Sequence, residues 1–258
     1  MRTVEEKISE DKVKYFGVTD KGKTRFDNQD AFEVKYIASK SLLITVLCDG
    51  MGGQNAGALA SEISVETFME NVISKVTSRI NKKLNFERIL IDACDETNTT
   101  AYDYSNFDPS LFGMGTTIVG SIITSDGHAT IISVGDSRCY LLNAEGISQI
   151  TTDHSLVEDL IRSGAITREQ AKTHKQRSII TRAIGSDIDV DADLFEIDLK
   201  EGNMLMFCSD GLTNYVSDYE IYSKYLDEPD PEKFCTKLIE LTYEHGAGDN
   251  VTIISVVK

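Results

Sequence analysis

Basic residues are scarce in this sequence. Its 258 residues include 26 Lys and Arg against 42 Asp and Glu, for a formal net charge of −16. Nucleic acids and anionic membrane surfaces attract concentrations of Lys and Arg, so this balance argues against binding to either. No apolar run approaches the roughly 20 residues that span a bilayer, and residues 1–14 lack the apolar core of a signal peptide. We therefore expect a soluble, cytoplasmic protein that neither binds nucleic acid nor inserts into membranes.

Several familiar functional motifs are also missing. The five cysteines form no CxxC pair, and the four histidines show neither zinc-ligand spacing nor an HExxH motif. An odd number of unpaired cysteines indicates reduced thiols. The EF-hand pattern, the Walker A and GxGxxG loops and the GxSxG elbow are absent as well. These absences argue against a zinc site, an EF-hand calcium site, a glycine-rich nucleotide-binding loop and the active site of an α/β-hydrolase.

Hydrophobic patterning predicts strands and helices in separate blocks. Apolar or alternating runs predict strands at 13–18, 31–37, 41–47, 116–124, 128–134, 139–143, 146–151, 193–199, 203–208 and 251–257. Helical patterns cover 55–80, 86–105, 218–226 and 231–245. Residues 1–12 are expected to be a loosely held lead-in, and 154–185 a polar helical insertion. Because no linker or repeat divides the chain, we predict a single α+β domain.

Aspartate adjoins a predicted strand at several points, each time near glycine or another small residue. In Leu47-Cys48-Asp49-Gly50-Met51-Gly52-Gly53 the strand ends at Asp49, and the glycines keep side chains away from its carboxylate. The other members of this set are Asp30, Asp136, Asp210 and Asp249. One such junction is compatible with an ordinary turn, but the recurrence suggests carboxylates that meet where strands end.

Carboxylates brought together in this way need a compensating cation. Two of them about 4 Å apart repel each other by roughly 4 kcal/mol at an effective dielectric constant near 20. An all-oxygen set of aspartates, completed by a glycine carbonyl and water, suits Mg²⁺ or Mn²⁺. The pattern therefore predicts a divalent-metal site.

The same segments resemble, in order, the motif series of the metal-dependent protein phosphatases of type 2C. The matching segments are Asp49-Gly50-Met51-Gly52-Gly53, Gly115-Thr116-Thr117, Val134-Gly135-Asp136-Ser137-Arg138, Ser209-Asp210-Gly211-Leu212 and Gly248-Asp249-Asn250-Val251-Thr252. Two further segments resemble the compact bacterial members, Asp153-His154-Ser155-Leu156-Val157 and Ile180-Thr181-Arg182-Ala183-Ile184-Gly185. The series covers residues from about 15 to 257. We expect Gly115-Thr116-Thr117 to be a packing turn and strand start.

The resemblance implies both a fold and an activity. Members of the family fold as an α-β-β-α sandwich, two stacked antiparallel sheets flanked by helices, with metals between the sheets at one end. The implied enzyme is a serine/threonine phosphoprotein phosphatase, a phosphoric monoester hydrolase. A water or hydroxide bridged by two metals attacks phosphorus directly, without a phosphoenzyme. The absence of a CxxxxxR loop agrees with this chemistry. A bacterial serine/threonine kinase is the implied partner, and we expect a monomer.

The family pattern also implies a role for each matching metal ligand. Asp49 would bridge two Mn²⁺ or Mg²⁺ ions, with the Gly50 carbonyl as a further ligand. Asp210 and Asp249 would complete the shell of the first ion. Asp136, together with Asp210, would hold a third, weaker ion. No organic cofactor is expected.

Two further residues match the catalytic positions of the family, and two depart from it. Asp30 would hold a metal-bound water, and Arg25 would bind the substrate phosphate through its planar fork of donors. Gln29 stands where many relatives have glutamate, which puts the affinity for the second metal in question. Met51 stands where eukaryotic relatives have a histidine that is a candidate general acid, so water is the expected proton source.

By resemblance, residues 154–185 would form a flap beside the active site. Its basic residues Lys172, His174, Lys175 and Arg177 either form a solvated face or help to receive phosphopeptides. For His154 we weigh a structural role as a helix cap against contact with substrate.

Two rival hypotheses come from other functional classes. The chain could be a catalytically silent binding or regulatory module, against which the intact Asp49, Asp210 and Asp249 argue. Alternatively, it could be a metal-dependent enzyme acting on a different phosphate ester. Turnover of a phosphothreonine peptide and of a small ester distinguishes these hypotheses.

Overall fold

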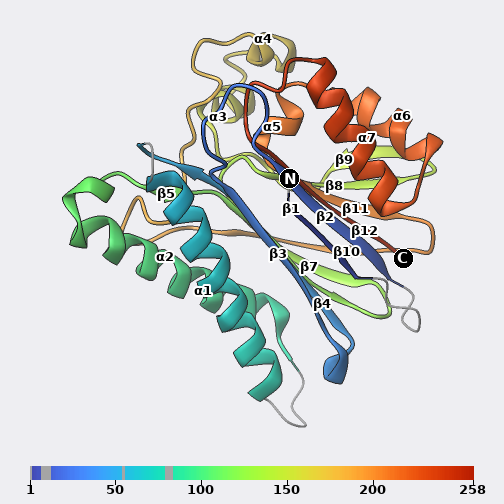
Figure 1. The fold of residues 1–258 in the computed structure, drawn as a ribbon, viewed down its shortest axis with the longest axis horizontal. Helices are drawn as coiled ribbons and strands as arrows, with labels where there is room; N and C mark the ends of the chain where they lie inside the picture. Colours follow the sequence, from blue (N-terminus) through green and yellow to red (C-terminus); the bar gives the residue numbers. More distant parts are fainter. Residues whose placement is uncertain (1, 7–12, 54–55, 79–83) are drawn as a thin grey trace.

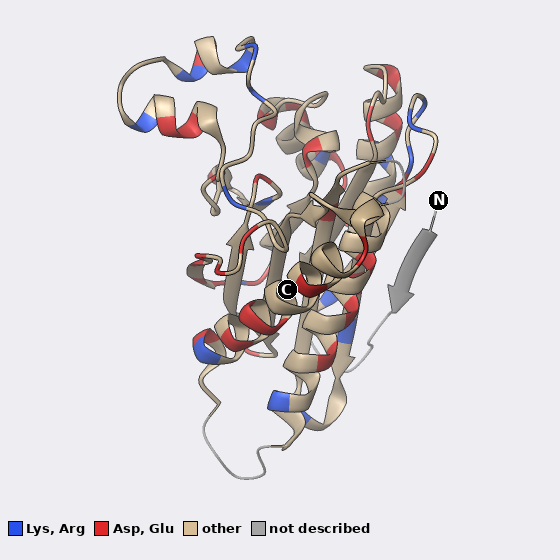
Figure 2. Ribbon diagram, turned by 90° about the vertical axis from the view of Figure 1, so that its left-hand side faces the viewer, with Lys and Arg blue, Asp and Glu red and all other residues tan. Residues whose placement is uncertain are grey.

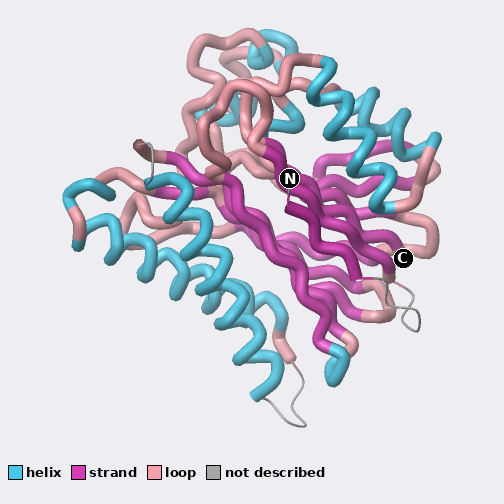
Figure 3. Tube along the Cα trace, viewed as in Figure 1, coloured by secondary structure: helices cyan, strands magenta, loops and turns pink. Residues whose placement is uncertain are grey.

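Two antiparallel sheets lie face to face in the middle of the molecule, and helices cover the outer face of each (Figures 1 and 3). This computed structural model describes residues 2–6, 13–53, 56–78 and 84–258. The expected arrangement of stacked antiparallel sheets flanked by helices, in one α+β domain, is therefore confirmed. None of the helices that the structure describes is both long and apolar enough to cross a membrane.

The first sheet brings the two ends of the chain together. Its strands, in spatial order, are β1 (Arg2–Glu6), β2 (Lys14–Asp20), β12 (Val251–Val257), β11 (Met204–Cys208), β8 (Arg138–Asn143) and β9 (Gly146–Gln149). The second sheet has the order β10 (Asp193–Asp198), β7 (His128–Val134), β6 (Ile118–Thr124), β4 (Leu42–Met51) and β3 (Asp30–Ile37), with β5 (Gly115–Thr116) paired to the end of β4. Central strands such as β4 are buried on both faces, which explains why they are continuous apolar runs in the sequence.

Two pairs of helices provide the outer layers. The pair α1 (Ala56–Ser78) and α2 (Phe86–Phe107) covers the second sheet, and the pair α6 (Asp218–Asp227) and α7 (Pro231–Glu244) covers the first (Figure 1). Shorter elements are α3 (Leu156–Arg162), α4 (Arg168–Lys172), α5 (Asp210–Thr213), η1 (Ala38–Lys40) and η2 (Pro109–Leu111). Side-chain caps begin several of the helices, as at α6, where Ser217 and Glu220 form a capping box.

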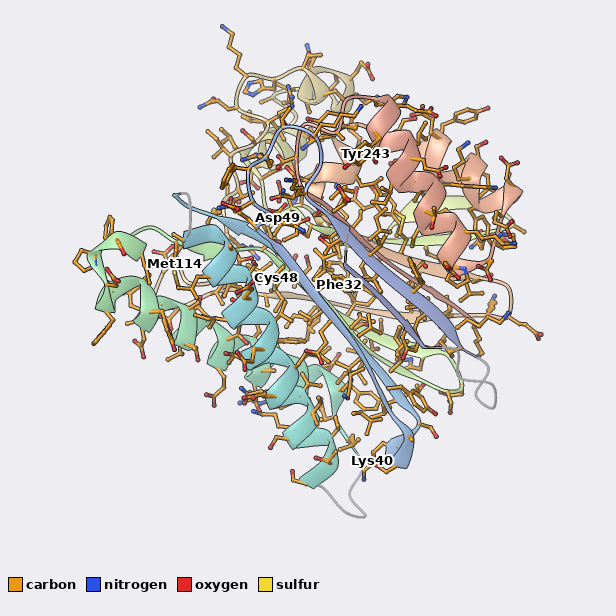
Figure 4. All side chains as sticks on the ribbon, viewed as in Figure 1. Phe32, Lys40, Cys48, Asp49, Met114 and Tyr243 are labelled. Carbon is orange, nitrogen blue, oxygen red and sulfur yellow. The ribbon has the colours of Figure 1, made fainter. Side chains whose placement is uncertain are left out.

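The apolar core has three layers, one between the sheets and one beneath each helix pair. Phe68 of α1 is fully buried in the layer under the second sheet. Phe207 of β11 and Phe32 of β3 belong to the layer between the sheets, where Figure 4 shows Phe32. Phe234 of α7 is buried in the layer under the first sheet. Because both sheets pack on both faces, the strand ends are held in fixed relative positions.

The structure departs from the sequence-based expectations in a few segments. Of the lead-in expected at 1–12, residues 2–6 form β1, because the edge of β2 offers them unpaired backbone groups; residues 1 and 7–12 lie outside the described residues. The strand β4 continues past Asp49 to Met51, since β3 and β5 supply partners for its last residues. The segment 154–185 holds only two short helices. Of the helix predicted at 55–80, Asn55 and residues 79–80 lie outside the described residues.

Filling the space between the sheets with one methyl group should destabilise the fold. A Cβ atom added at Gly17 of β2 would lie 2.4 Å from Cε2 of Phe32, which is only 2% exposed. Overpacking a core of this density costs about 1–3 kcal/mol. We therefore expect Gly17→Ala to lower the free energy of unfolding by that amount, as measured by urea denaturation followed by circular dichroism. Gly53→Ala is the matched control, because its added methyl meets none of the described residues within 4 Å; an equal loss in both variants would contradict the packing argument.

Candidate metal centre

The predicted metal-site aspartates lie at strand ends of both sheets. Asp30 begins β3 and is the antiparallel partner of Asp49 in β4. Asp136 follows β7, Asp210 follows β11 as the first residue of α5, and Asp249 precedes β12. Figure 4 shows Asp49 near one end of the sheets and Lys40 at the other. The arrangement of the strands thus gathers these carboxylates at one end of the sandwich.

Electrostatics shows that the carboxylates are close enough to influence one another. Burial raises the pKa of Asp49 well above its usual value, and the charges of Asp30, Asp210, Asp136 and Asp249 raise it further. Burial raises the pKa of Asp30 and of Asp136 to about 7 in each case. The pKa of Asp210 is raised by burial first and by the charge of Asp249 second. The site therefore holds more negative charge than its own surroundings can compensate.

Asp30 has one oxygen fixed and one left open. Its Oδ2 accepts hydrogen bonds from Ser209 Oγ at 2.8 Å and from Thr252 Oγ1 at 2.7 Å. The backbone N–H of Thr252 donates in turn to Ser209 Oγ at 3.0 Å. The other oxygen, Oδ1, is buried and has no hydrogen-bond partner among the residues that the structure describes. An orphaned buried acceptor of this kind is suited to a water or ion supplied from outside the chain.

Threonines 116 and 117 hold the backbone of Asp49. The carbonyl of Asp49 accepts from Thr117 N at 2.9 Å and from Thr116 Oγ1 at 2.8 Å. The N–H of Asp49 donates to Thr117 Oγ1 at 3.0 Å, and that hydroxyl also contacts Ser137 Oγ at 2.7 Å. Thr117 thus links Asp49 to the residue after Asp136. The expectation of a mere packing turn missed this positioning role.

Gly50 is a glycine because the backbone approaches it closely. A Cβ atom there would lie 2.0 Å from the carbonyl oxygen of Gly57 and 2.7 Å from that of Gln29. The N–H of Gly50 also donates to the Gln29 carbonyl at 3.0 Å. The sequence-based explanation, in which glycine clears space around the carboxylate of Asp49, is therefore incomplete. At Gly50 the missing side chain allows a loop and a helix to pack against the end of β4.

Arg25 lies at the rim of the site and pairs with Asp249. Its Nη2 donates to Asp249 Oδ2 at 2.8 Å, and its Nε lies 2.8 Å from Oδ1. This two-point contact raises the pKa of Arg25. The side chain of Arg25 is 51% exposed, so the N–H groups of its guanidinium that do not face Asp249 remain accessible to a solvent-borne anion.

His154 neither caps a helix nor faces solvent. Ser155 caps α3, since its side chain accepts from the N–H of Glu158. His154 is buried, and its ring Nδ1 accepts from the backbone N–H of Gly135 at 3.0 Å. The backbone N–H of His154 donates to the Gly135 carbonyl at 2.8 Å. Its Nε2 lies 3.2 Å from Asp193 Oδ2. The helix-cap hypothesis is therefore wrong, and the residue instead holds the turn that precedes Asp136.

The donor set fits a divalent cation. In the part of the chain that the structure describes, no three His, Cys, Asp or Glu side chains form a group arranged to hold an ion by themselves. Mg²⁺ and Mn²⁺ do not require such a group, because they retain waters and accept carbonyl oxygens. The carboxylates with raised pKa values supply negative charge that a cation can neutralise, and the open Oδ1 of Asp30 supplies an acceptor for a water or ion.

Comparison with known proteins identifies the family. The family model described as protein phosphatase 2C matches residues 23–232. The chain belongs to the protein phosphatase 2C family. This phosphatase is 36% identical over 247 residues to the serine/threonine phosphatase stp of Listeria monocytogenes serotype 4b, a match that covers 93% of this chain and 94% of the relative.

Solved structures agree with this assignment. The serine/threonine phosphatase of S. agalactiae matches this phosphatase with a TM-score of 0.85 and 31% identity, over 95% of this chain and 99% of that one. The catalytic domain of the phosphatase PstP, solved in complex with two manganese ions, matches with a TM-score of 0.82 and 28% identity, over 95% and 99% of the respective chains. The predicted family and fold are thereby confirmed.

Without metal, this phosphatase should lose stability as the pH rises from about 4 to about 7. The folded state holds Asp30 and Asp136 with pKa values of about 7, whereas an unfolded aspartate titrates near about 3.9. The folded state therefore binds more protons in this interval, and raising the pH favours unfolding. Urea unfolding of chelator-treated protein at several pH values measures the effect.

Added Mn²⁺ should reverse this trend, because it compensates the ionised carboxylates. Asp30→Asn should reduce the pH dependence of the metal-free protein, since the amide does not titrate while Asp136 still does. Asp218→Asn, at the exposed start of α6, should leave it unchanged. A rise in stability between pH values of about 4 and about 7 would contradict the assignment of raised pKa values.

Proposed function

We propose that this phosphatase hydrolyses phosphoserine and phosphothreonine in proteins with the help of divalent metal ions. The observation that carries the proposal is the gathering of Asp30, Asp49, Asp136, Asp210 and Asp249 at one end of the sandwich, with Arg25 at the rim. Relatives named serine/threonine phosphatases support the choice of substrate class.

Each aspartate has a proposed place around the ions. Asp49 would be a ligand shared by two ions, with the Gly50 carbonyl as a further ligand. Asp210 and Asp249 would complete the ligands of the first ion. Asp136 and Asp210 would hold a third ion more weakly, since fewer of the chain's carboxylates are available there. We propose Mn²⁺ or Mg²⁺ because every donor is an oxygen.

The residues around the ions orient the reactants. Bound divalent ions supply a water that loses its proton more readily and neutralise charge on the phosphoryl group. Asp30, whose Oδ2 is held by two hydroxyls, offers its open Oδ1 to orient the attacking water. Arg25 binds phosphoryl oxygens through its fork. Met51 cannot donate a proton, so we propose that solvent protonates the leaving group.

The remaining proposals concern the surroundings of the site. We propose that residues 154–185 form a flap; Figure 2 shows α3 and α4 set apart from the sheets, with basic residues on them. Lys172, Lys175 and Arg177 are exposed there, and they offer positive charge to phosphopeptides on an otherwise acidic protein. We further propose that this phosphatase is a cytoplasmic monomer, and that it removes phosphate groups that a serine/threonine kinase adds in signalling.

Removing one proposed ligand should abolish metal-dependent turnover. We expect wild-type protein to hydrolyse a phosphothreonine peptide with Mn²⁺ and to stop when chelator is added. Asp210→Ala should lower kcat/KM by a factor on the order of 100 or more and weaken Mn²⁺ binding in calorimetry. Asp218→Ala, an exposed aspartate nearby in the sequence, is the control. No Mn²⁺-dependent turnover by the wild type would overturn the proposal, and turnover of only a small phosphate ester would favour a different substrate class.

Replacing Arg25 by lysine should weaken substrate binding while the charge is kept. Lysine cannot make the two-point contact of a guanidinium with a phosphate. We expect Arg25→Lys to raise KM for a phosphothreonine peptide roughly tenfold, in steady-state assays with saturating Mn²⁺. Arg88→Lys in α2 is a matched control, since Arg88 is exposed and paired with Asp92. An unchanged KM in Arg25→Lys would rule out Arg25 as the phosphate ligand.

A further inference from the structure

Phe26 directly follows Arg25 in the loop between β2 and β3, and it is 81% exposed. Single apolar residues are common on protein surfaces, so exposure alone indicates nothing. The position of Phe26 distinguishes it. The loop lies at the end of the molecule where Asp49 is found (Figures 1 and 4), and its preceding residue is the one assigned to the substrate phosphate.

The backbone on both sides of Phe26 is anchored to the segment that precedes β12. Asn250 donates through Nδ2 to the carbonyls of Lys21 and Asp27, at 3.0 Å each. Between these points, the N–H of Lys23 donates to the Ala247 carbonyl at 2.8 Å. The loop is therefore tied down at both ends and in its middle.

Further contacts fix the same loop from its inner side. Thr24 Oγ1 donates to the carbonyl of Gly248 at 2.5 Å. A Cβ atom at Gly22 would lie 2.2 Å from the carbonyl oxygen of Asp249, so the two backbones are in direct contact. Because Arg25 also turns towards Asp249, the inner side of the loop is occupied. Phe26 is held outwards by an ordered backbone.

Phe26 and Arg25 are separated by the spacing of neighbouring residues. Consecutive Cα atoms are about 3.8 Å apart, so the backbone of Phe26 lies that far from the backbone of the residue proposed to bind phosphate. An extended substrate advances by about 3.3 Å per residue. With its phosphate on Arg25, an extended phosphopeptide therefore has its flanking residues about as far from the phosphorylated residue as Phe26 is from Arg25 along the chain.

We propose that Phe26 contacts an apolar side chain beside the phosphorylated residue and makes the phosphatase prefer phosphopeptides with apolar flanks. This inference rests on the proposed function and extends it to substrate choice. An acidic flank is disfavoured, because the protein carries a net charge of −16 and the site gathers carboxylates. An apolar contact, unlike an ion pair, gives a preference that salt does not screen.

The test compares two phosphothreonine peptides that differ only in their flanking residues, leucine in one and serine in the other. With saturating Mn²⁺, the wild type should favour the leucine peptide roughly tenfold in kcat/KM, through a lower KM. The ratio should persist when the salt concentration is raised. Phe26→Ala should bring the ratio close to one, and Phe26→Leu, which keeps an apolar side chain, should retain most of it.

Phe107→Ala is the matched control, because Phe107 ends α2 and is 92% exposed; it should keep the wild-type ratio. A ratio that persists in Phe26→Ala would overturn the inference. Equal turnover of the two peptides by the wild type would overturn it as well, while leaving the proposed function intact. Failure of the wild type to hydrolyse either peptide would overturn the proposed function and this inference with it.

Discussion

Carboxylates from both sheets lie at the same end of the molecule, and they repel one another. Asp49 illustrates the result, because burial and four neighbouring aspartates all raise its pKa. No apolar packing relieves such repulsion; only protons or cations do. The fold must therefore be stable enough elsewhere to hold these groups together, and the layers of core around the two sheets provide that stability.

The site is held mainly by neutral hydrogen-bonding groups. Hydroxyls of Ser209 and Thr252 fix Asp30, and those of Thr116 and Thr117 fix the backbone of Asp49. Neutral donors position the carboxylates without neutralising them, so the negative charge remains available to a cation. Arg25, which pairs with Asp249, is charged, but it stands at the rim, where a phosphate can reach it.

The sequence predicted those parts of the fold that depend on local pattern. β7 and β12 have the predicted bounds, because both strands are buried along nearly their whole length and buried strands appear in a sequence as runs of apolar residues. β1 was missed, since an edge strand held by backbone pairing needs no regular pattern of apolar residues in its sequence. The aspartates of the site were recognisable from their recurring context. Their hydroxyl partners were not, because Ser209 and Thr252 are 179 and 222 residues away from Asp30 in the sequence.

The strand β12 has a consequence for how the protein is made. It lies between β2 and β11 in the first sheet, and the hydroxyl of Thr252 meets that of Thr19 across 233 residues of sequence. Contacts between such distant parts of a chain form late and slowly. Until β12 emerges from the ribosome, the first sheet is divided into two parts, β1 with β2 and β11 with β8 and β9, because β12 is the strand that pairs with both β2 and β11. The site depends on the same strand, because Asp249 directly precedes β12 and Thr252 within it donates a hydrogen bond to Asp30.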